Sequence, residues 1–387
     1  MNNVIALQHY NKNMAVSGIL SPEQQDAPET GATITVHFVE DHYFDQRAAR
    51  YLDVVSEQTS RFTTSRWGVH RTECAVVKRD DEEIALAVIV MIALPGTQRG
   101  LAILKWGPLW RVKGEAPDVT RLRDALGALT EEYVTRRGCF LSVQTHADPE
   151  FSEAQLAALE SLGFTPGRSL PYPDRYLVDV SISPEELKAS LDQKWRYNLK
   201  KSLKNNLEIK MVEAEEGYEA FMQLYNEMLE RKQFRDTSAI YTLSDLMKTK
   251  EPGLKPVFVM VTADGRPTAG AVISVAGERA VYLYGATDER ALRLKAGYAM
   301  HGWIADWLCS LPEVRWYDLG GSDGDSGLHQ FKKGFCGKAG QIVATPPSFR
   351  RCRSALDDLL GRTIYMARDV KAATSSALHK AKALFAE

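Results

Sequence analysis

The sequence predicts an α/β protein in which helices pack on mixed β-sheets, and two observations lead to this class. Strand-like and helix-like patterns alternate along most of the chain, an arrangement typical of sheets covered by helices. The same order also occurs twice: strand, helix, hairpin, strand, helix, strand. No residue-level repeat with a fixed period accompanies it, so we interpret the duplication as one of topology.

In the first half, alternating apolar residues predict the first strand, and Asp118 is a cap-like start for a long helix. A turn-prone segment at 79–82 joins two strands of a hairpin. The elements expected there are a strand at 33–38, a helix at 43–58, strands at 73–78, 83–94 and 100–106, a helix at 118–137, a strand at 139–144, a helix at 152–162 and a strand at 176–180.

The second half opens with a capping-box pattern, in which Pro184 follows Ser183 and Glu186 lies three residues after the serine. The dipeptide Asp264-Gly265 is a strong hairpin turn. The elements expected after them are a strand at 207–212, a helix at 215–231, strands at 256–262, 268–275 and 280–284, a helix at 291–308, a strand at 314–319 and a helical tail at 354–385.

Composition limits the classes of function. A chain of 387 residues with 44% apolar content is expected to form two or three domains with full cores. The net charge of −2 argues against a general nucleic-acid binder, so any anion site must be a local patch. The five cysteines have no CxxC spacing and the eight histidines are scattered, so we expect reduced thiols and no bound metal.

The N-terminal stretch is polar and lacks the apolar core of a secretory signal. The most apolar run, 84–95, is too short to span a bilayer. We therefore expect a soluble, cytoplasmic protein that begins with a flexible tail.

The most informative segment runs from Asp325 to Gly337. It follows a short apolar strand that ends in Asp318 and two glycines, and it places two lysines between Phe331 and Phe335. Neighbouring lysines among apolar rings suit an anion or a developing negative charge. This segment resembles the C-terminal signature of the FemABX family, the aminoacyl-tRNA-dependent transferases that build peptidoglycan cross-bridges.

The resemblance implies two tandem GNAT-like acyltransferase domains. On this basis the chain divides into a flexible tail at 1–32, a first domain at 33–182, a second domain at 183–349 that carries the catalytic segment, and a helical tail at 350–387.

A second match opens the second domain. Lys194-Trp-Arg-Tyr-Asn198 resembles the family's Lys-x-Arg-x-Asn motif, and the resemblance implies that Arg196 contacts the phosphates of a nucleotide- or lipid-linked muropeptide. Trp195, Leu199 and Leu203 share one helix face, which favours core packing. The basic stripe beside them could equally be a solvated surface.

A third match lies at 63–71, where the family has Gln-Ser-x-x-Trp-x-x-x-Lys. Trp67 fits, Arg71 stands where the lysine is expected, and Thr63 replaces the glutamine. The resemblance implies that Trp67 and Arg71 bind the acceptor. From the residues alone, a core tryptophan and a surface arginine are the favoured reading.

A fourth match places Tyr282 and Tyr284 two residues apart on a strand, so we expect both on the same face. Two phenols on one face could stack on a base or ribose. Half-buried tyrosines of an ordinary sheet are the alternative.

The expected chemistry is attack of an amine on an activated carbonyl. Lys332 would stabilise the tetrahedral oxyanion, and Phe331 would pack beside it and restrict water, as the family relation also implies. Lys333 is either a second phosphate contact or merely exposed. Asp318 either orients the amine or caps the loop that follows it. His329 is a lone histidine without an assigned role.

The donor is expected to be aminoacyl-tRNA, with no bound cofactor. The acetyl-CoA loop of GNAT enzymes has its nearest counterpart at 293–299, which reads as mid-helix, and the basic residues between 331 and 353 could follow tRNA phosphates. The acceptor would be an amine of a peptidoglycan precursor or another peptide, and a peripheral membrane contact is possible. Two alternatives stay open: an N-acyltransferase that uses a thioester donor, and a non-catalytic tRNA or nucleotide-sugar binding protein.

Overall fold

The computed structural model describes residues 32–232 and 238–367. Inter-residue contacts divide the chain into Met1–Thr33 and Ile34–Glu387, and the description below concerns the second unit. The predicted tail at 1–32 and the end of the predicted C-terminal tail therefore lie almost wholly outside the described residues. Within the described part, residues 355–367 are helical.

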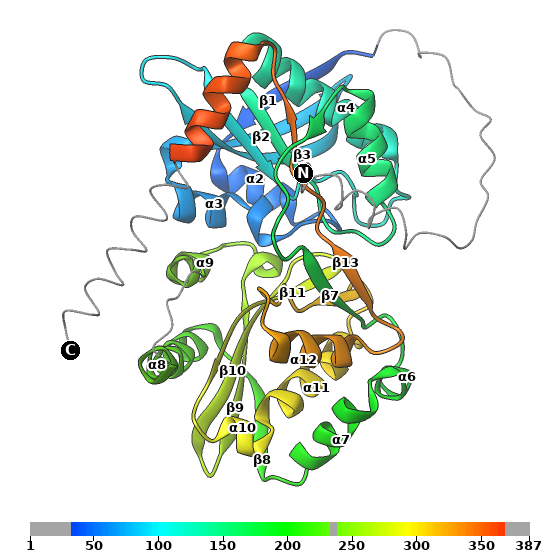
Figure 1. Cartoon of the computed structure of the whole chain (residues 1–387), viewed down its shortest axis with the longest axis vertical. Coiled ribbons are helices and arrows are strands. Elements are labelled where there is room, and N and C mark those ends of the chain that lie inside the picture. The colour runs from blue at the N-terminus through cyan, green and yellow to red at the C-terminus, as the bar shows by residue number, and fades with distance from the viewer. Residues whose placement is uncertain (1–31, 233–237, 368–387) are drawn as a thin grey trace. The chain divides into compact units, whose positions relative to one another are not determined.

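The first sheet has the strand order β1-β2-β3-β4-β5-β14-β6 (Figure 1). All neighbours in it are antiparallel except β4 and β5, which run parallel. Its strands are β1 (Ile34–Val39), β2 (Thr72–Arg79), β3 (Glu82–Ala93), β4 (Gly100–Lys105), β5 (Phe140–Gln144), β14 (Phe349–Arg351) and β6 (Thr165–Pro166).

The second sheet has the order β13-β7-β12-β11-β10-β9-β8. Again one neighbouring pair, β11 and β12, is parallel and the others are antiparallel. Its strands are β13 (Gln341–Ala344), β7 (Asp174–Asp179), β12 (Trp316–Asp318), β11 (Arg279–Thr287), β10 (Arg266–Val275), β9 (Val257–Ala263) and β8 (Leu207–Val212).

The two sheets therefore have the same topology, which confirms the duplication expected from the sequence. Each sheet also takes one strand from the other half of the chain. β7 precedes the predicted boundary at 182 but pairs with β12 and β13, whereas β14 ends the chain's second half but pairs with β5 and β6. The boundaries remain predictions, and this exchange shows that a cut at residue 182 would remove a strand from the second sheet.

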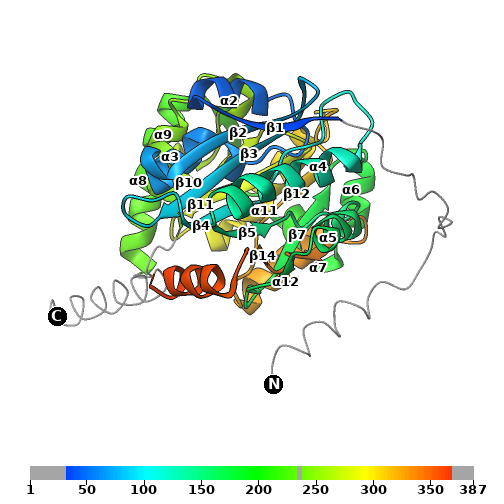
Figure 2. The same ribbon diagram turned by 90° about the horizontal axis from the view of Figure 1, so that it is seen from above.

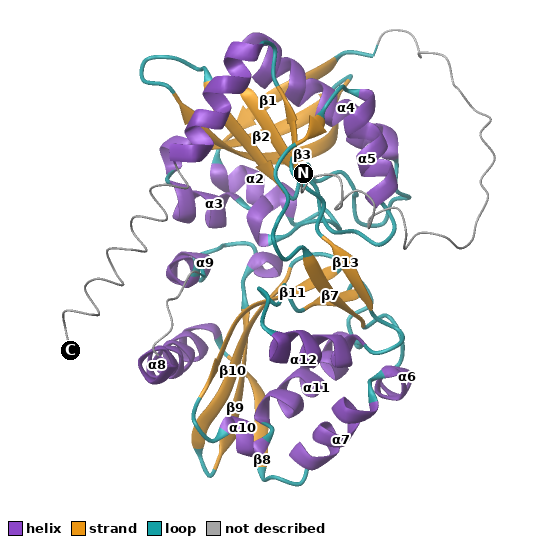
Figure 3. Cartoon of the chain, viewed as in Figure 1, coloured by secondary structure: helices purple, strands orange, loops and turns teal. Residues whose placement is uncertain are grey.

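Helices cover these sheets as the alternating pattern predicts (Figure 3). On the first sheet, α4 and α5 pack on one face and enclose a hydrophobic core. On the second sheet, α7, α11 and α12 enclose a core on one face, and α8 encloses another on the opposite face. The helices are α2 (Asp41–Ala48), α3 (Ser60–Trp67), α4 (Val119–Thr130), α5 (Ser152–Ser161), α6 (Pro184–Ser190), α7 (Gln193–Ser202), α8 (Ala214–Lys232), α9 (Leu243–Leu246), α10 (Ala291–Leu294), α11 (Ala296–Leu308) and α12 (Ser326–Cys336).

Local sequence signals explain several element ends. Ser183 and Glu186 form the capping box of α6, and Asp118 accepts a hydrogen bond from the amide of Thr120 at the start of α4. The hairpin turn has positive φ angles at Asp264 (52°) and Gly265 (72°), the conformation that favours this dipeptide.

The predicted helix at 43–58 is wrong in its second part. α2 ends at Ala48, because the following residues bond to another segment instead of continuing the helix. The amide of Leu52 donates to the carbonyl of Arg111 over 2.7 Å, and Asp53 accepts from the amide of Trp110. Tertiary bonding therefore overrides helix propensity here.

The predicted single helix at 291–308 is also wrong. It breaks at Lys295, whose φ of 55° is left-handed, so that α10 ends at Leu294 and α11 starts at Ala296. The side-chain amide of Asn205 donates to the carbonyl of Leu294 over 2.7 Å and stabilises the end of α10.

Candidate functional site

Lys332 lies on α12, which Asp325 caps by accepting a hydrogen bond from the amide of Leu328. The lysine is buried, with 7% of its surface exposed. The Nζ atom donates to the carbonyls of Leu319 over 2.6 Å and Gly321 over 2.5 Å. The ammonium therefore holds the loop that leaves β12.

Burial lowers the pKa of Lys332 to about 8, although the nearby carboxylate of Asp318 favours the charged form. An ammonium has three N–H donors, and the two loop carbonyls accept two of them. Among the described residues, the third donor has no acceptor. This geometry is compatible with the predicted role at an oxyanion, and that role stays a prediction.

Asp318 is buried at the end of β12 and binds two arginines. Its carboxylate lies 2.9 Å from Nη2 of Arg175 and 3.2 Å from Nη1 of Arg279, and it accepts a 2.8 Å bond from the amide of Gly320. Burial alone would raise the pKa of Asp318, but the two guanidinium groups hold it below its usual value. Of the two predicted roles, the structure shows the cap of the following loop.

Aromatic rings surround the helix face of Phe331. Its ring centroid lies 5.0 Å from Tyr298, 5.5 Å from His301 and 5.9 Å from Trp195. Phe331 thus packs against rings of α7 and α11, while the backbone carbonyls described above orient the ammonium of Lys332. Desolvation lowers the pKa of His301 to about 3, with a further contribution from Lys332, and its Nδ1 lies 2.9 Å from the hydroxyl of Tyr317.

The parallel pair next to this cluster is short. β12 has only three residues, which pair with β11 from Arg279 to Val281, while β11 continues to Thr287. A β-bulge in β11 follows the paired residues, because Tyr282 and Tyr284 face the consecutive residues Ile273 and Val272 of β10.

The expectation that both tyrosines share one face is therefore wrong. Tyr282 packs with the core beneath α11, whereas Tyr284 belongs to the core beneath α8. The bulge inserts one residue between them and reverses the alternation. The hydroxyl of Tyr282 lies only 1.6 Å from the place where a Cβ on Gly285 would stand, so this position requires glycine.

A cavity of about 670 Å³ lies on the first sheet, a size suited to a small-molecule ligand. Trp67 and Phe62 of α3 contribute apolar surface, and Arg66, Lys105 and Arg168 contribute positive charge. The remaining lining residues are Glu57, Thr63, Val88, Val90, Ile103, Ser142, Gln144, Ser169, Leu170, Ser348 and Tyr365. Glu57 pairs with Lys105 over 3.2 Å. Arg66 has no ion pair with another described residue, so its charge favours an anion in the cavity.

A row of contacting side chains links this cavity to Lys332. The Nζ of Lys105 lies 4.3 Å from the ring centroid of Trp106, and the guanidinium of Arg175 lies 4.6 Å from the same ring. Arg175 binds Asp318, which holds the loop that Lys332 also binds. The φ of Trp106, 59°, is unusual for a non-glycine residue and marks a position that the surroundings enforce.

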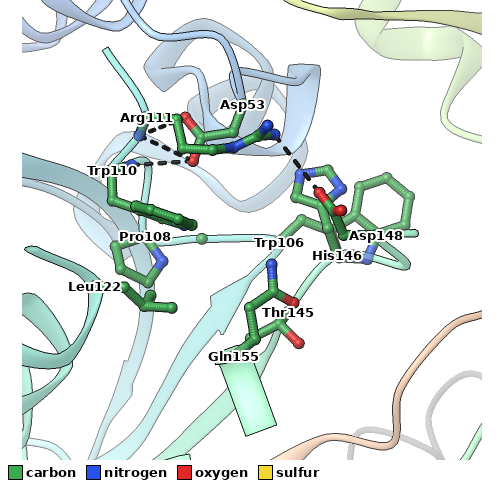
Figure 4. Close-up of a pocket in the computed structure, with 11 residues that line it drawn as sticks. Asp53, Trp106, Pro108, Trp110, Arg111, Leu122, Thr145, His146, Asp148 and Gln155 are labelled. Atoms are coloured by element: carbon green, nitrogen blue, oxygen red, sulfur yellow. Dashed lines mark hydrogen bonds and ion pairs between the residues drawn. The ribbon is translucent and has the colours of Figure 1, made fainter. Parts of the chain in front are cut away.

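A second, much smaller hollow surrounds Asp53 and Arg111 (Figure 4). It has a volume of about 10 Å³, which is about the space of one water molecule, so it cannot hold a substrate. Arg111 approaches Asp148 over 3.6 Å and donates to Glu278 over 2.9 Å. Because Glu278 precedes β11, this buried network joins the two halves of the fold.

Three predicted residues lie elsewhere. Arg196 is exposed, and its guanidinium donates to the carbonyls of Ala189 and Leu191. These bonds stabilise the end of α6. Arg71 lies exposed on the 3₁₀ turn Val69–Arg71 and does not line the cavity. Lys333 is exposed on α12. Their predicted contacts with a ligand stay predictions.

The basic residues near the end of the described chain are partly engaged. Arg350 and Arg353 pair with Asp358 and Asp357, and Arg351 donates to the carbonyl of Gly163. These contacts leave fewer free charges for a tRNA than the sequence suggests. Within 32–232 and 238–367, no group of three metal-ligating side chains occurs, and no helix is long and apolar enough to cross a bilayer.

Sequence reasoning missed Lys105, Trp106, Arg168, His301 and Tyr365. None lies in the motifs that the sequence made conspicuous, and their association depends on strand pairing across long separations. His301 had one signal, its place in a mostly apolar helix that also contains aromatic residues.

Comparisons with known proteins agree with the fold. Residues 190–333 match the family model described as an acetyltransferase (GNAT) domain. The crystal structure of FemX superposes with a TM-score of 0.65 and 15% identity, covering 82% of this chain and 97% of FemX. The C-terminal domain of a putative lysylphosphatidylglycerol synthetase from Agrobacterium fabrum gives 0.56 and 14% identity, covering 82% of this chain and 94% of that domain.

A conserved protein of unknown function from Bacteroides thetaiotaomicron gives a TM-score of 0.54 and 12% identity, covering 83% of this chain and all of that one. A search of curated protein sequences gives no match. The α/β fold and the resemblance to FemABX proteins are thus confirmed at the level of structure, and the second half carries a GNAT domain.

Proposed function

We propose that this chain, which has the fold of FemX and carries a GNAT domain, is an aminoacyltransferase. It moves an amino acid from aminoacyl-tRNA to an amine of an anionic acceptor, such as a peptidoglycan precursor or another peptide. The observation that carries the proposal is the buried ammonium of Lys332, which binds the loop that follows β12.

The reaction needs a stabilised oxyanion. The acceptor amine attacks the ester carbonyl, the carbonyl oxygen becomes negative, and the tetrahedral intermediate loses the ribose oxygen of the tRNA. The third N–H of Lys332 supplies a fixed donor for that oxygen, and one such donor is worth about 3 kcal/mol. The vicinal hydroxyl of the ribose can transfer the proton from the amine to the leaving oxygen, so this scheme requires no protein base.

The cavity on the first sheet is the proposed acceptor site. Arg66 suits a phosphate or carboxylate, because a guanidinium group can form paired hydrogen bonds with either. Trp67 offers a flat apolar surface in the same wall. The contacts from Lys105 through Trp106 to Arg175 support a link between this site and the Lys332 loop.

A thioester donor is the second candidate, and the helix break at Lys295 favours it. The start of α11 presents backbone amides beside Gly297, whose Cα has open space around the position of a side chain. Such a helix start can bind a pyrophosphate. This segment is therefore not mid-helix, so that argument against a thioester donor no longer holds. The experiment below distinguishes the two donors.

The deciding experiment measures transfer from two labelled donors to the same mixture of peptide and muropeptide acceptors. One donor is aminoacyl-tRNA prepared with all amino acids, and the other is acetyl-CoA. The proposal expects amide product from the tRNA donor, abolished by ribonuclease. Product from acetyl-CoA alone would establish the second candidate. Saturable tRNA binding without product from either donor would contradict both and indicate a binding protein.

A further inference from the structure

A histidine on the catalytic helix is held in place by the sheet beneath it. His329 precedes Lys332 by three residues on α12, so the two side chains are neighbours on the helix surface. α12 lies beside β7 (Figure 2). Nδ1 of His329 lies 2.5 Å from the phenol oxygen of Tyr176 on β7, and the two rings meet edge-on with centroids 5.7 Å apart. A fully buried tyrosine therefore orients the imidazole.

His329 and Lys332 are tied to the same loop. Lys332 binds two carbonyls of the loop that follows β12, the second of them that of Gly321. The hydroxyl of Ser322, the next residue, accepts a hydrogen bond from the phenol of Tyr176 over 3.4 Å, and this phenol also bonds to His329. The ammonium and the imidazole thus belong to one bonded group of side chains around this loop.

These hydrogen bonds determine which ring nitrogen of His329 is protonated. The phenol of Tyr176 has one proton, and it donates this proton to Ser322. It must then accept from His329, so the neutral imidazole has its proton on Nδ1. Nε2 keeps its lone pair, bonds to no other described residue and is not fully buried. The ring therefore presents a proton acceptor that a ligand can reach.

The proposed transfer has a proton to remove before the amine attacks. A primary amine is largely an ammonium at neutral pH, and in that form its nitrogen has no lone pair. The ribose hydroxyl acts later, on the proton that the nitrogen loses after the new bond has formed. The attacking nitrogen joins the carbonyl carbon whose oxygen Lys332 binds, so it comes close to the neighbouring side chain, His329.

We propose that His329 is the catalytic base that takes this first proton from the acceptor. The proton moves from the ammonium nitrogen to Nε2, and the lone pair left on the nitrogen forms the bond to the carbonyl carbon. The imidazolium then releases the proton to water, while Nδ1 keeps its own. Tyr176 and Ser322 are positioning residues that hold the ring. This inference rests on the proposed function, but the protonation of the ring can be measured without transfer.

The test compares two acceptors of nearly the same size. Methylamine is an ammonium at neutral pH, whereas hydroxylamine is largely uncharged there and needs no base before attack. After subtraction of the rates without enzyme, His329→Gln is expected to lower the rate with methylamine about 10²-fold and the rate with hydroxylamine less than about threefold. Lys332→Met should lower both rates alike, because it acts on the carbonyl oxygen. His42→Gln, at an exposed histidine of α2, is the matched control and should change neither rate.

A structural role for the histidine would give a different result. If His329→Gln lowered the two rates equally, the inference would be overturned, because removal of a base has no effect on an amine that is already uncharged. Tyr176→Phe keeps the buried ring and removes only the hydroxyl. It should lower the rate with methylamine about fivefold and leave the rate with hydroxylamine unchanged.

The protonation of the ring gives a readout that is independent of transfer. In ¹⁵N NMR of the chain labelled at histidine, the His329 signals are identified by their loss in His329→Gln. The neutral ring is expected to have its proton on Nδ1, and a proton on Nε2 would overturn the inference even if transfer occurs. The expected protonation without product from either donor would reject the aminoacyltransferase and leave the accessible base on α12 established.

Discussion

The two sheets share one strand order but differ at their parallel pair. In the first sheet, β4 and β5 stay paired over five positions, from Leu101 to Lys105. In the second, β12 has only three residues, all paired with β11, and β11 continues past them through a β-bulge against β10. The same topology therefore gives a longer parallel pair in one half than in the other.

The position of the ligand features follows this difference. The first sheet carries the cavity on the face opposite α4 and α5, where side chains of β3, β4 and β5 form its floor. In the second sheet, helices pack on both faces, and Lys332 lies beside the loop that follows β12. In the proposed function, the first half therefore binds the acceptor and the second half binds the acyl group.

The largest expected effect comes from a substitution in the second half, and it is an effect on kcat. Lys332→Met removes the ammonium from the second half and should lower kcat by about 10²- to 10³-fold, with a smaller change in KM for the acceptor. Steady-state kinetics measure both. Lys250→Met, at an exposed lysine outside the proposed site, is the control and should change neither by more than about twofold.

A substitution in the first half is expected to affect KM for the acceptor. Arg66→Ala in the cavity should raise KM for an anionic acceptor about tenfold and leave kcat nearly unchanged. If Arg66→Ala and Lys332→Met altered kcat and KM to the same extent, the proposed division of roles would be wrong.

The junction between the halves is expected to dominate stability. Arg111→Met should lower the free energy of unfolding by about 3–5 kcal/mol, because it leaves the carboxylates of Asp148 and Glu278 without their buried partner. Urea denaturation measures this loss. Arg123→Met, at a side chain with 59% exposure, should cost less than about 0.5 kcal/mol, and an equal cost would show that the network is not special.

Smaller effects on stability, of opposite sign, are expected when two glycines of the second half are changed to alanine. Gly285→Ala would force the Tyr282 hydroxyl aside and should cost about 1–3 kcal/mol. Gly297→Ala meets open space in α11 and should instead stabilise the chain by about 0.4–1 kcal/mol. Thermal denaturation of both variants checks the signs, and destabilisation by both would contradict the described packing.

Local patterns were sufficient to predict most of the fold. The capping box at Ser183, the turn at Asp264 and the alternating strands all follow from neighbours in sequence, and the structure confirms them. The exchange of β7 and β14 was not predictable in this way, because each strand is short and its partners lie in the other half of the chain. The break at Lys295 likewise depends on a distant side chain, Asn205.

The candidate site likewise has features that follow from sequence neighbours and features that depend on distant contacts. The Phe331-Lys332 motif is conspicuous in the sequence, and the structure places it in a buried cluster. Tyr284 was assigned to the wrong face because alternation assumes an unbroken strand, and a bulge cannot be seen in the residue pattern. Tyr365 and Arg168 meet only through the docking of a helix, which no local signal indicates.

The pH dependence of transfer tests the central claim most directly. The groups that influence Lys332 are Asp318, Arg175, Asp323 and Cys336, and burial dominates in setting its pKa near 8, below the ordinary 10.5. Between these two values the unfolded chain binds more protons than the folded chain, so this lysine makes stability rise with pH. The oxyanion donor is lost over the same range, so the rate should fall by about tenfold per pH unit above about 8.

The two trends therefore have opposite signs, which separates loss of the ammonium from loss of the fold. Single-turnover rates from pH 6 to 10, measured together with unfolding midpoints, should show a descending limb near pH 8 in a chain that stays folded. A free amine acceptor by itself would react faster as the pH rises. A rate that keeps increasing to pH 10 would contradict the account, because the ammonium of Lys332 would then take no part in the reaction.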